Sequence, residues 1–510
     1  MKSLLHTLTA SLLLSVSQAQ DPIIYTVDLT DQRNDQLSIR VDLPALDREV
    51  VTFAFPRMVP GIYGAMEHGR LVHAVSAFDE EGYPMAVRKV DVNTYVIEEG
   101  RALRTLTYAV DDGWEEFAPL YQYGSYRSSE GTVKRDAQVI NHNALFGYVV
   151  GEERRPVEVR MTHAPTHFPA TGLTSTAKAP GSTVLTARDY RHLVDNPMLI
   201  ADPDTVHLLI GNTKVLVACH STTGQPIARM ISEQAKPLLR DQFAYLRALP
   251  LERYTLLIYH HPNREEGNYQ ADGLEHASST LILLCLPLEA EMLGGVVSDI
   301  ISHEVFHTLL PIHLHGEEIA HYDWSDPQVG SHLWLYEGMT EYFAMHMPVK
   351  QGRATVQEFL ATLEEKTKKM SGFPDDEALT LLSRDAVTRQ DAYPNFYQKG
   401  ALFCMLLDIE LRALSKGRYG AVDLCTDMAR VYGPDKPFKD DALFAELARV
   451  SGLPSIEGFL RDHLDRPVKL DVAKQLARAG IVRDATNGGY RSDPKATGEQ
   501  QKLRKAWLGR

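Results

Sequence analysis

Two histidines four residues apart, His303 and His307, enclose a carboxylate in the pentad HEVFH, residues 303–307. On a helix, residues four apart lie on one face with their Cβ atoms about 5–6 Å apart, so both imidazoles can bind one metal ion. Glu304 would then lie beside the open coordination position, where a carboxylate can act as a general base. The pentad therefore predicts a site for one Zn²⁺ per chain and a hydrolytic reaction.

The residues before the pentad predict the helix that carries it. Val296, Val297, Ile300 and Ile301 form an apolar stripe with helical spacing, and Pro311 ends the run. The pentad thus falls in the last two turns of a buried helix. An acid and two histidines in such a helix need polar partners, which a bound metal supplies.

Catalytic zinc usually takes three protein ligands, and three residues compete for the third position. Asp326 follows the pentad at a suitable interval, but it precedes a proline in a loop-like stretch, which is a poor rigid platform. His313 lies ten residues after His303, a spacing that needs glycine at the intervening turn, where this chain has Leu310 followed by Pro311. Both residues are therefore weaker candidates than Glu337.

Glu337 lies in the segment WLYEGMTEYF, residues 334–343, whose apolar spacing predicts an amphipathic helix. A helix holds a ligand side chain more rigidly than a loop does, and we favour Glu337 for this reason. Glu341 lies one helical turn further on. It is either the hydrogen-bond partner of a ligand histidine or a solvated helix charge.

The chain divides into a β-rich and a helical part. Between residue 21 and about residue 210, apolar and polar residues alternate, as in 37–43, 106–110 and 157–161. From about residue 288 apolar faces recur with helical spacing, and after residue 482 apolar anchors become scarce. We predict an α+β protein with four segments: a signal peptide at 1–19, an N-terminal antiparallel β-domain at 20–210, a mainly helical catalytic domain at 211–483 and a flexible tail at 484–510.

Composition limits the partners and the location. Residues 1–19 have the features of a secretory signal peptide, with Lys2, an apolar stretch at 4–16 and a small-x-small cleavage site. No other segment is apolar enough to predict a membrane span, so we expect a secreted or periplasmic protein. The net charge of −14 argues against nucleic acid as a partner. The sequence leaves open the oligomeric state and whether Cys404 and Cys425 pair.

The pentad, the long interval after it and the Glu-Gly-x-Thr-Glu-Tyr helix resemble the glycyl aminopeptidase family, metallopeptidase family sixty-one, whose members are gluzincins related to aminopeptidase N. Three upstream stretches are similar to the N-terminal domain of that family: PGIY at 60–63, INHNALFGY at 140–148 and LVDNP at 193–197. The resemblance covers about residues 24–480. It implies that the catalytic domain is thermolysin-like.

The resemblance also implies roles for three further residues. The segment GLEH, residues 273–276, is similar to the edge motif that precedes the pentad in these aminopeptidases, where the glutamate binds the substrate's α-ammonium. A carboxylate at the blind end of a cleft pairs with a free N-terminus and rejects an internal peptide, so Glu275, with Gly273, is expected to bind substrate. Tyr397, in the segment YQKGA, resembles the tyrosine that donates a hydrogen bond to the tetrahedral oxyanion.

Together these observations predict a zinc-dependent aminopeptidase acting on peptides, and the family name implies a preference for N-terminal glycine. One alternative is a gluzincin endopeptidase, in which Glu275 has no anchoring role. Another is a non-catalytic binding or scaffold protein on the same fold. Many family members carry a C-terminal PDZ domain, and here the residues after about 480 are too few to form one.

Overall fold

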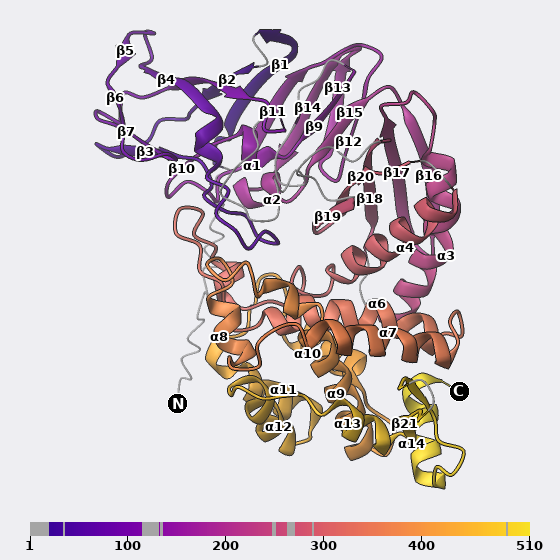
Figure 1. The fold of residues 1–510 in the computed structure, drawn as a ribbon. Helices are drawn as coiled ribbons and strands as arrows, with labels where there is room; N and C mark the ends of the chain where they lie inside the picture. The colour runs from indigo at the N-terminus through magenta and orange to yellow at the C-terminus, as the bar shows by residue number, and fades with distance from the viewer. Residues whose placement is uncertain are drawn as a thin grey trace, which may run out of the picture.

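The computed structural model describes residues 20–509 except 34–35, 115–131, 133–135, 247–250, 263–270, 288–289 and 486–487. The predicted signal peptide lies outside these residues. Strands gather in the N-terminal half and most helices in the C-terminal half (Figure 1), which confirms the α+β class. Within the described ranges, no helix combines the length and hydropathy that a membrane span requires.

An eight-stranded sheet forms one layer of the N-terminal domain. Its neighbouring strands are antiparallel, except β1 and β11, which pair in parallel. The alternation predicted from the sequence is confirmed, since Leu37, Ile39 and Val41 of β2 are 0%, 1% and 0% exposed. In spatial order the strands are β13 (Thr174–Ala179), β14 (Ser182–Ala187), β11 (Val157–Thr162), β1 (Ile23–Arg33), β2 (Gln36–Asp42), β8 (Thr105–Asp111), β4 (Val72–Phe78) and β5 (Pro84–Met85).

A four-stranded sheet packs against this layer. The two sheets share one hydrophobic core, in which the rings of Phe53 and Tyr108 lie 5.8 Å apart between centroids. Two short helices, α1 (His142–Leu145) and α2 (Tyr190–Val194), border this core. The sheet consists of β10 (Tyr148–Val149), β3 (Val51–Ala54), β7 (Thr94–Ile97) and β6 (Val87–Lys89).

A three-stranded sheet joins the N-terminal domain to a five-stranded sheet. Val139 and Leu199 of the first share a hydrophobic cluster with Leu257 and Leu281 of the second. In order, the first contains β12 (Phe168–Thr171), β15 (Met198–Ala201) and β9 (Ala137–Ile140), and the second β16 (Asp204–Ile210), β17 (Thr213–Ser221), β18 (Arg253–His261), β20 (Ser279–Cys285) and β19 (Ala271–Glu275).

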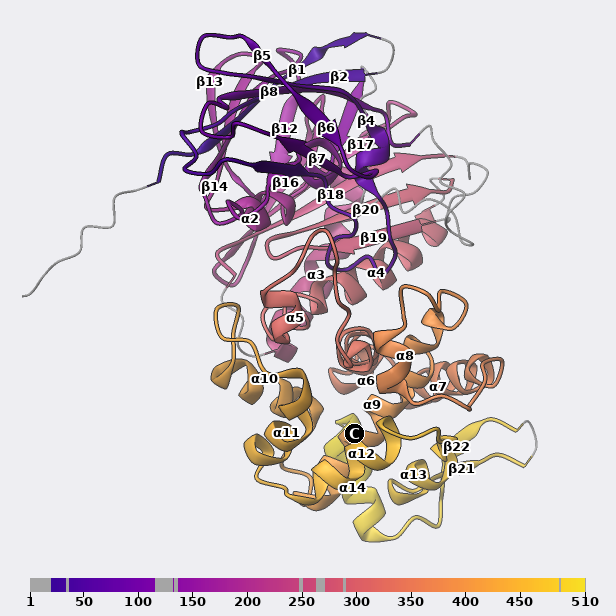
Figure 2. The ribbon, with the colours of Figure 1, turned by 90° about the vertical axis from the view of Figure 1, so that its left-hand side faces the viewer.

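The five-stranded sheet shifts the predicted domain boundary. Strand β16 pairs along its whole length with β17, so this sheet begins near residue 204 rather than at residue 211. Helices α3 (Ala228–Leu246) and α4 (Ala290–Phe306) cover one face of the sheet (Figure 2). Val297 and Ile301, from the stripe predicted before the pentad, are both 0% exposed and pack there.

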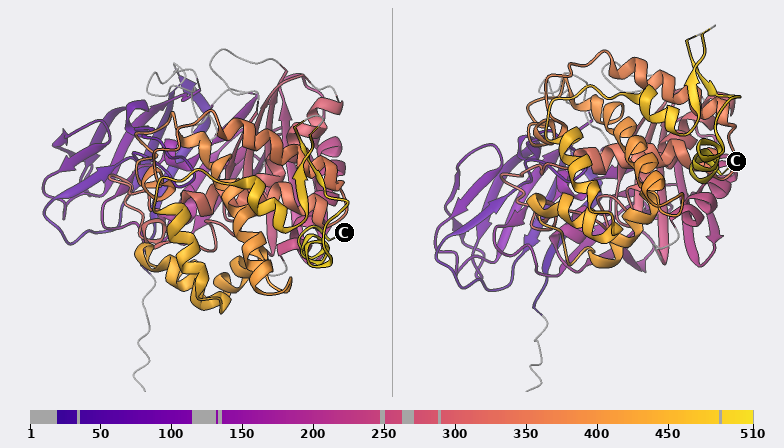
Figure 3. Two further views of the ribbon diagram at one scale, coloured as in Figure 1. Left: turned by 60° about the horizontal axis from the view of Figure 1, so that its bottom comes forward. Right: turned by 90° about the horizontal axis from the view of Figure 1, so that it is seen from below.

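The helical region is built around α9 (Lys399–Leu414), which is buried over most of its length because its sequence is apolar on nearly every side. Seen from below, the helices of this region lie in front of the five-stranded sheet (Figure 3). The other elements of this region are α5 (Glu317–Ala320), α6 (Met339–Lys350), α7 (Val356–Met370), α8 (Leu379–Arg384), α10 (Ala421–Val431), α11 (Leu443–Ser451), α12 (Ser455–Leu464), α13 (Val472–Arg478), β21 (Ile481–Arg483), β22 (Tyr490–Ser492) and α14 (Gly498–Leu508).

The prediction of a flexible tail at 484–510 was wrong. Helix α14 begins with a capping box at Thr497, and Trp507 is 0% exposed. The Trp507 indole donates a hydrogen bond to the Tyr342 hydroxyl at 2.9 Å, and its carbonyl lies 3.0 Å from Nε2 of His346. One large aromatic residue with two polar contacts therefore fixes a segment whose average composition is polar.

Candidate active site

Helix α4 and the turn after it direct both histidines of the pentad at one point. The Nε2 atoms of His303 and His307 lie 3.0 Å apart. Nδ1 of His303 lies 2.9 Å from Oε2 of Glu341, and Nδ1 of His307 lies 2.7 Å from the carbonyl oxygen of Leu310. Because a carboxylate and a carbonyl only accept, each ring donates from Nδ1 and turns Nε2 inward, where a neutral ring presents a lone pair. Two facing lone pairs repel unless a cation lies between them.

A π-helical turn, Trp334–Gly338, brings a carboxylate to the two histidines. Such turns often occur at functional sites because the extra residue redirects side chains. Glu337 is 2% exposed, and its Oε2 lies 3.4 Å from Nε2 of His303 and 3.7 Å from Nε2 of His307. The sequence anticipated a helix here, and the structure adds the local widening that aims Glu337 at the histidines.

Two glycines bring this turn against α9. A Cβ on Gly338 would lie 2.6 Å from the carbonyl carbon of Gly400, and a Cβ on Gly400 would lie 3.2 Å from Cα of Gly338. A larger side chain at either position would separate the two backbones. Since Tyr397 lies just before α9, this contact holds Tyr397 and Glu337 in the same site.

The three candidate ligand atoms form a triangle with sides of 3.0, 3.4 and 3.7 Å. Tetrahedral zinc with bonds of about 2.0–2.2 Å would separate its ligands by roughly 3.3–3.6 Å. The residues present therefore fit a zinc ion held by two imidazoles and one carboxylate. His303, His307 and Glu337 are also one of two groups in the described chain whose ligand atoms lie within 4.8 Å of one another.

The other two candidates for the third ligand lie elsewhere. Nε2 of His313 lies 3.2 Å from the carbonyl oxygen of Ala429. The Asp326 side chain is 74% exposed and lies 3.9 Å from the guanidinium of Arg57. Neither of them is among the residues grouped with the pentad histidines.

Glu341 holds one ligand in place. It accepts from Nδ1 of His303 through one oxygen and from Nζ of Lys366 through the other, at 2.6 Å. Burial opposes its ionisation, but the hydrogen bonds from His303 and Lys366 outweigh burial and lower the pKa of Glu341 to about 2. Lys366 also donates to the Tyr397 carbonyl at 2.9 Å, so one ammonium links the histidine support to the Tyr397 backbone.

The general-base candidate, Glu304, lies beside the ligand triangle. One of its oxygens lies within 4.8 Å of ligand atoms of His307 and Glu275, and its Oε2 is buried without a hydrogen-bond partner in the described part of the chain. Burial raises the pKa of Glu304 well above its ordinary value, although His303 opposes the shift. Gly273 permits this packing, since a Cβ there would lie 2.9 Å from Oε1 of Glu304.

Glu275 ends strand β19 and is 7% exposed. Gly61 of the N-terminal domain covers it, because a Cβ on Gly61 would lie 2.9 Å from each Glu275 carboxylate oxygen. Burial raises the pKa of Glu275, and His307 opposes the shift. A buried carboxylate in this position becomes stably ionised when a cation binds beside it.

Tyr397 faces the same site. Its ring lies 5.4 Å from that of His303 between centroids, and its hydroxyl lies 3.0 Å from the Tyr393 hydroxyl. Burial, and then the charge of Glu337, raise the pKa of Tyr397 well above its ordinary value. The hydroxyl therefore keeps its proton and can donate it in a hydrogen bond.

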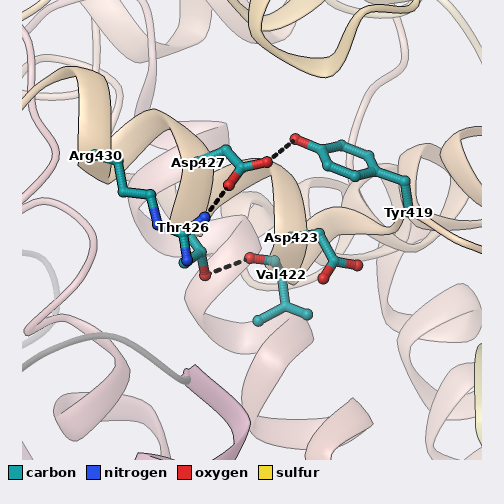
Figure 4. Close-up of a pocket in the computed structure, with 6 residues that line it drawn as sticks. All are labelled: Tyr419, Val422, Asp423, Thr426, Asp427 and Arg430. Atoms are coloured by element: carbon teal, nitrogen blue, oxygen red, sulfur yellow. Dashed lines mark hydrogen bonds and ion pairs between the residues drawn. The ribbon is translucent and has the colours of Figure 1, made fainter.

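A separate cavity of about 250 Å³ lies on α10 (Figure 4). Its Asp427 accepts from the Tyr419 hydroxyl at 3.1 Å and pairs with Arg430 at 2.5 Å. The charges of Asp427 and Arg430 compensate each other, and none of the candidate site residues lines this cavity.

All four cysteines are buried and free, including Cys404 and Cys425.

The site combines two imidazoles with the carboxylate of Glu337 and, beside them, the carboxylate of Glu304. This combination is typical of a metallopeptidase. Comparison with family models agrees with this class. The chain belongs to the M61 glycyl aminopeptidase family: the M61 N-terminal domain model matches residues 24–202, and the M61 glycyl aminopeptidase model matches residues 297–403. The two matched ranges together include more than half of the chain, and they confirm the resemblance seen in the sequence. The protein is thus a peptidase.

Solved structures share the fold. An aminopeptidase N family protein from Idiomarina loihiensis matches with 21% identity and a TM-score of 0.75, over 94% of this chain and 82% of that one. An M1 zinc metallopeptidase from Deinococcus radiodurans matches with 15% identity and a TM-score of 0.54, over 88% and 94%. A variant of that enzyme, with a Tyr-Ser-Ala substrate bound, matches with 16% identity and a TM-score of 0.54, over the same shares. A comparison with curated protein sequences found no match.

Sequence reasoning missed three residues of the site. Tyr393 lies four residues before Tyr397, a spacing that could have suggested a pair. Tyr63, whose ring lies 5.5 Å from that of Tyr393 between centroids, belongs to the PGIY stretch, where the pattern indicates the family but no role for the tyrosine. Lys366 carries no local signal, because nothing in its helix indicates that it faces Glu341.

Proposed function

We propose that this peptidase is a zinc-dependent aminopeptidase that removes N-terminal residues from peptides. His303, His307 and Glu337 would hold the ion. Zinc bound there supplies Lewis-acid chemistry, polarising the scissile carbonyl and making the attacking water more acidic. Residues of the chain itself would transfer the proton, stabilise the oxyanion and position these groups.

Glu304 takes the proton of the attacking water and passes it to the leaving amine, a transfer favoured by a carboxylate whose buried position raises its proton affinity. Tyr397 donates a hydrogen bond to the oxyanion that forms on the scissile carbonyl. Glu341 and Lys366 keep the His303 ring and the Tyr397 backbone in position.

The observation that carries the proposal is the buried carboxylate of Glu275. It lies next to Glu304 and His307, and the Gly61 backbone covers it on the other side. A free α-ammonium placed there makes a charge-assisted hydrogen bond worth about 1.5–3 kcal/mol. An internal peptide bond carries no such charge and would leave the carboxylate unpaired.

The test compares matched peptides with a free and an N-acetylated amino terminus. We expect kcat/KM to be at least about 100-fold higher for the free amine, because acetylation removes the charge and leaves Glu275 desolvated. Glu275→Ala should erase much of this preference and keep the metal. Equal rates on both peptides, or cleavage mainly at internal bonds, would favour the endopeptidase instead. Absence of metal and of any cleavage would favour a non-catalytic protein.

A further inference from the structure

The PGIY stretch of the N-terminal domain reaches the active site. Gly61 has φ +88° and lies against Glu275, and the Tyr63 ring lies 5.5 Å from that of Tyr393 between centroids. The side-chain amide of Gln390 donates a hydrogen bond to the Tyr63 carbonyl. Contacts from both parts of the chain therefore fix this stretch where Glu275 and the tyrosines meet.

The Tyr63 hydroxyl is buried and has no hydrogen-bond partner among the described residues. Burial raises the pKa of Tyr63, and the charge of Glu337 raises it further, so the hydroxyl keeps its proton. A buried hydroxyl without a partner costs free energy, and native proteins keep such a group mainly where a ligand or water completes it. The Tyr63 ring contacts Tyr393, and Gly61 of the same stretch lies against Glu275, which indicates that the ligand is the substrate's first residue.

We propose that Tyr63 binds the substrate's α-ammonium together with Glu275, so that the N-terminal domain supplies part of the amine site. An α-ammonium has three N–H donors, and a single carboxylate cannot accept all three in good geometry. The Tyr63 oxygen accepts one of them, and Glu275 accepts the others. This assignment rests on the proposed aminopeptidase function and extends it to a residue outside the catalytic part of the chain.

The glycine at position 61 allows the PGIY stretch to lie against Glu275. Its φ of +88° is readily adopted only by glycine, and a side chain there would collide with both Glu275 oxygens at 2.9 Å. The backbone therefore closes the end of the site without filling the space that the ammonium needs. The amine site is complete only when the N-terminal domain is in place.

The experiment uses Tyr63→Phe in the full-length, metal-loaded enzyme, since this change removes one oxygen and keeps the ring against Tyr393. For the free-amine peptide, kcat/KM should fall about tenfold or more, mainly through KM, because a hydrogen bond to a charged group is lost. For its N-acetyl twin the rate should change less than about twofold. Inhibition by alaninamide, measured as Ki, should weaken by about the same tenfold factor. Metal content should stay unchanged.

The matched control is Tyr322→Phe. The Tyr322 hydroxyl is also buried without a partner among the described residues, but its partly buried ring packs against the core of the N-terminal domain, with its centroid 4.9 Å from that of Trp324. This variant should keep both rates and the Ki, which separates loss of a substrate contact from a general effect of removing a buried hydroxyl.

The outcomes distinguish the two proposals. If the wild-type enzyme cleaves both peptides equally, the aminopeptidase function fails and the Tyr63 assignment fails with it. If the wild type prefers the free amine and Tyr63→Phe keeps the full preference, only the Tyr63 assignment is overturned. An equal loss on both peptides also overturns it, because the hydroxyl would then act at the reacting carbonyl.

Discussion

The two halves of the active site differ in how completely the protein satisfies their polar groups. In the metal half, each histidine has an acceptor on Nδ1, and Glu341 is fixed by Lys366. In the amine half, which surrounds Glu275, the Tyr63 hydroxyl is buried without a partner among the described residues, and the same holds for Oε2 of Glu304 at the boundary between the halves. Burial alone does not explain the contrast, since Glu337 is 2% exposed in the first half and Glu275 is 7% exposed in the second.

The difference indicates what each half binds. A resident metal ion needs ligands held in one geometry, which second contacts such as that of Glu341 provide. A substrate arrives and leaves, so its site keeps donors and acceptors that only the substrate completes. We therefore propose that the substrate binds at these unpaired buried groups, at the edge of the candidate metal site.

The largest effect is expected in the metal half, from removing the candidate ligand Glu337. Glu337→Ala leaves two imidazoles and should reduce bound zinc from about one per chain to near zero, with loss of all turnover. His313→Ala, which removes a histidine that lies outside the triangle, should keep both metal and activity. Metal analysis of the purified variants checks this, and the reverse pattern would sink the Glu337 assignment.

A smaller effect is expected at the boundary between the halves. Glu304→Gln keeps the volume and removes the base, so turnover should fall by about 10²–10⁴-fold while zinc remains bound. The measurement is kcat together with metal content. Substantial residual turnover in a metal-loaded variant would show that another group accepts the proton.

The smallest effect is expected from changing Glu341, which holds the His303 ring in position. Glu341→Gln should weaken zinc binding by about 10–100-fold, because His303 loses a charged acceptor while Glu337 stays in place. Competition with a chelator measures the change. Glu365→Gln, which alters an acid that is 63% exposed on α7, is the control and should leave zinc affinity unchanged. If the two variants behave alike, Glu341 does not support the metal site.

Much of the metal half could be read from local patterns. The pentad, the apolar stripe before it and the helix around Glu337 each involve neighbours along one helix, whose geometry is known in advance. The alternation in β2 identified buried strand residues for the same reason. The prediction failed at residues 484–510, where average polarity outweighed the single anchor Trp507.

The sequence by itself determined the chemistry: which residues can bind a metal, which acid lies beside them and which parts are sheet or helix. Only the tertiary structure shows that Glu337, rather than His313 or Asp326, lies beside the pentad histidines. The reason is that these segments are placed by long-range packing, such as that of Gly338 on Gly400. It also brought Lys366 to Glu341, Gly61 to Glu275 and Tyr63 to Tyr393. Such contacts join residues tens to hundreds of positions apart, and local periodicity contains no information about them.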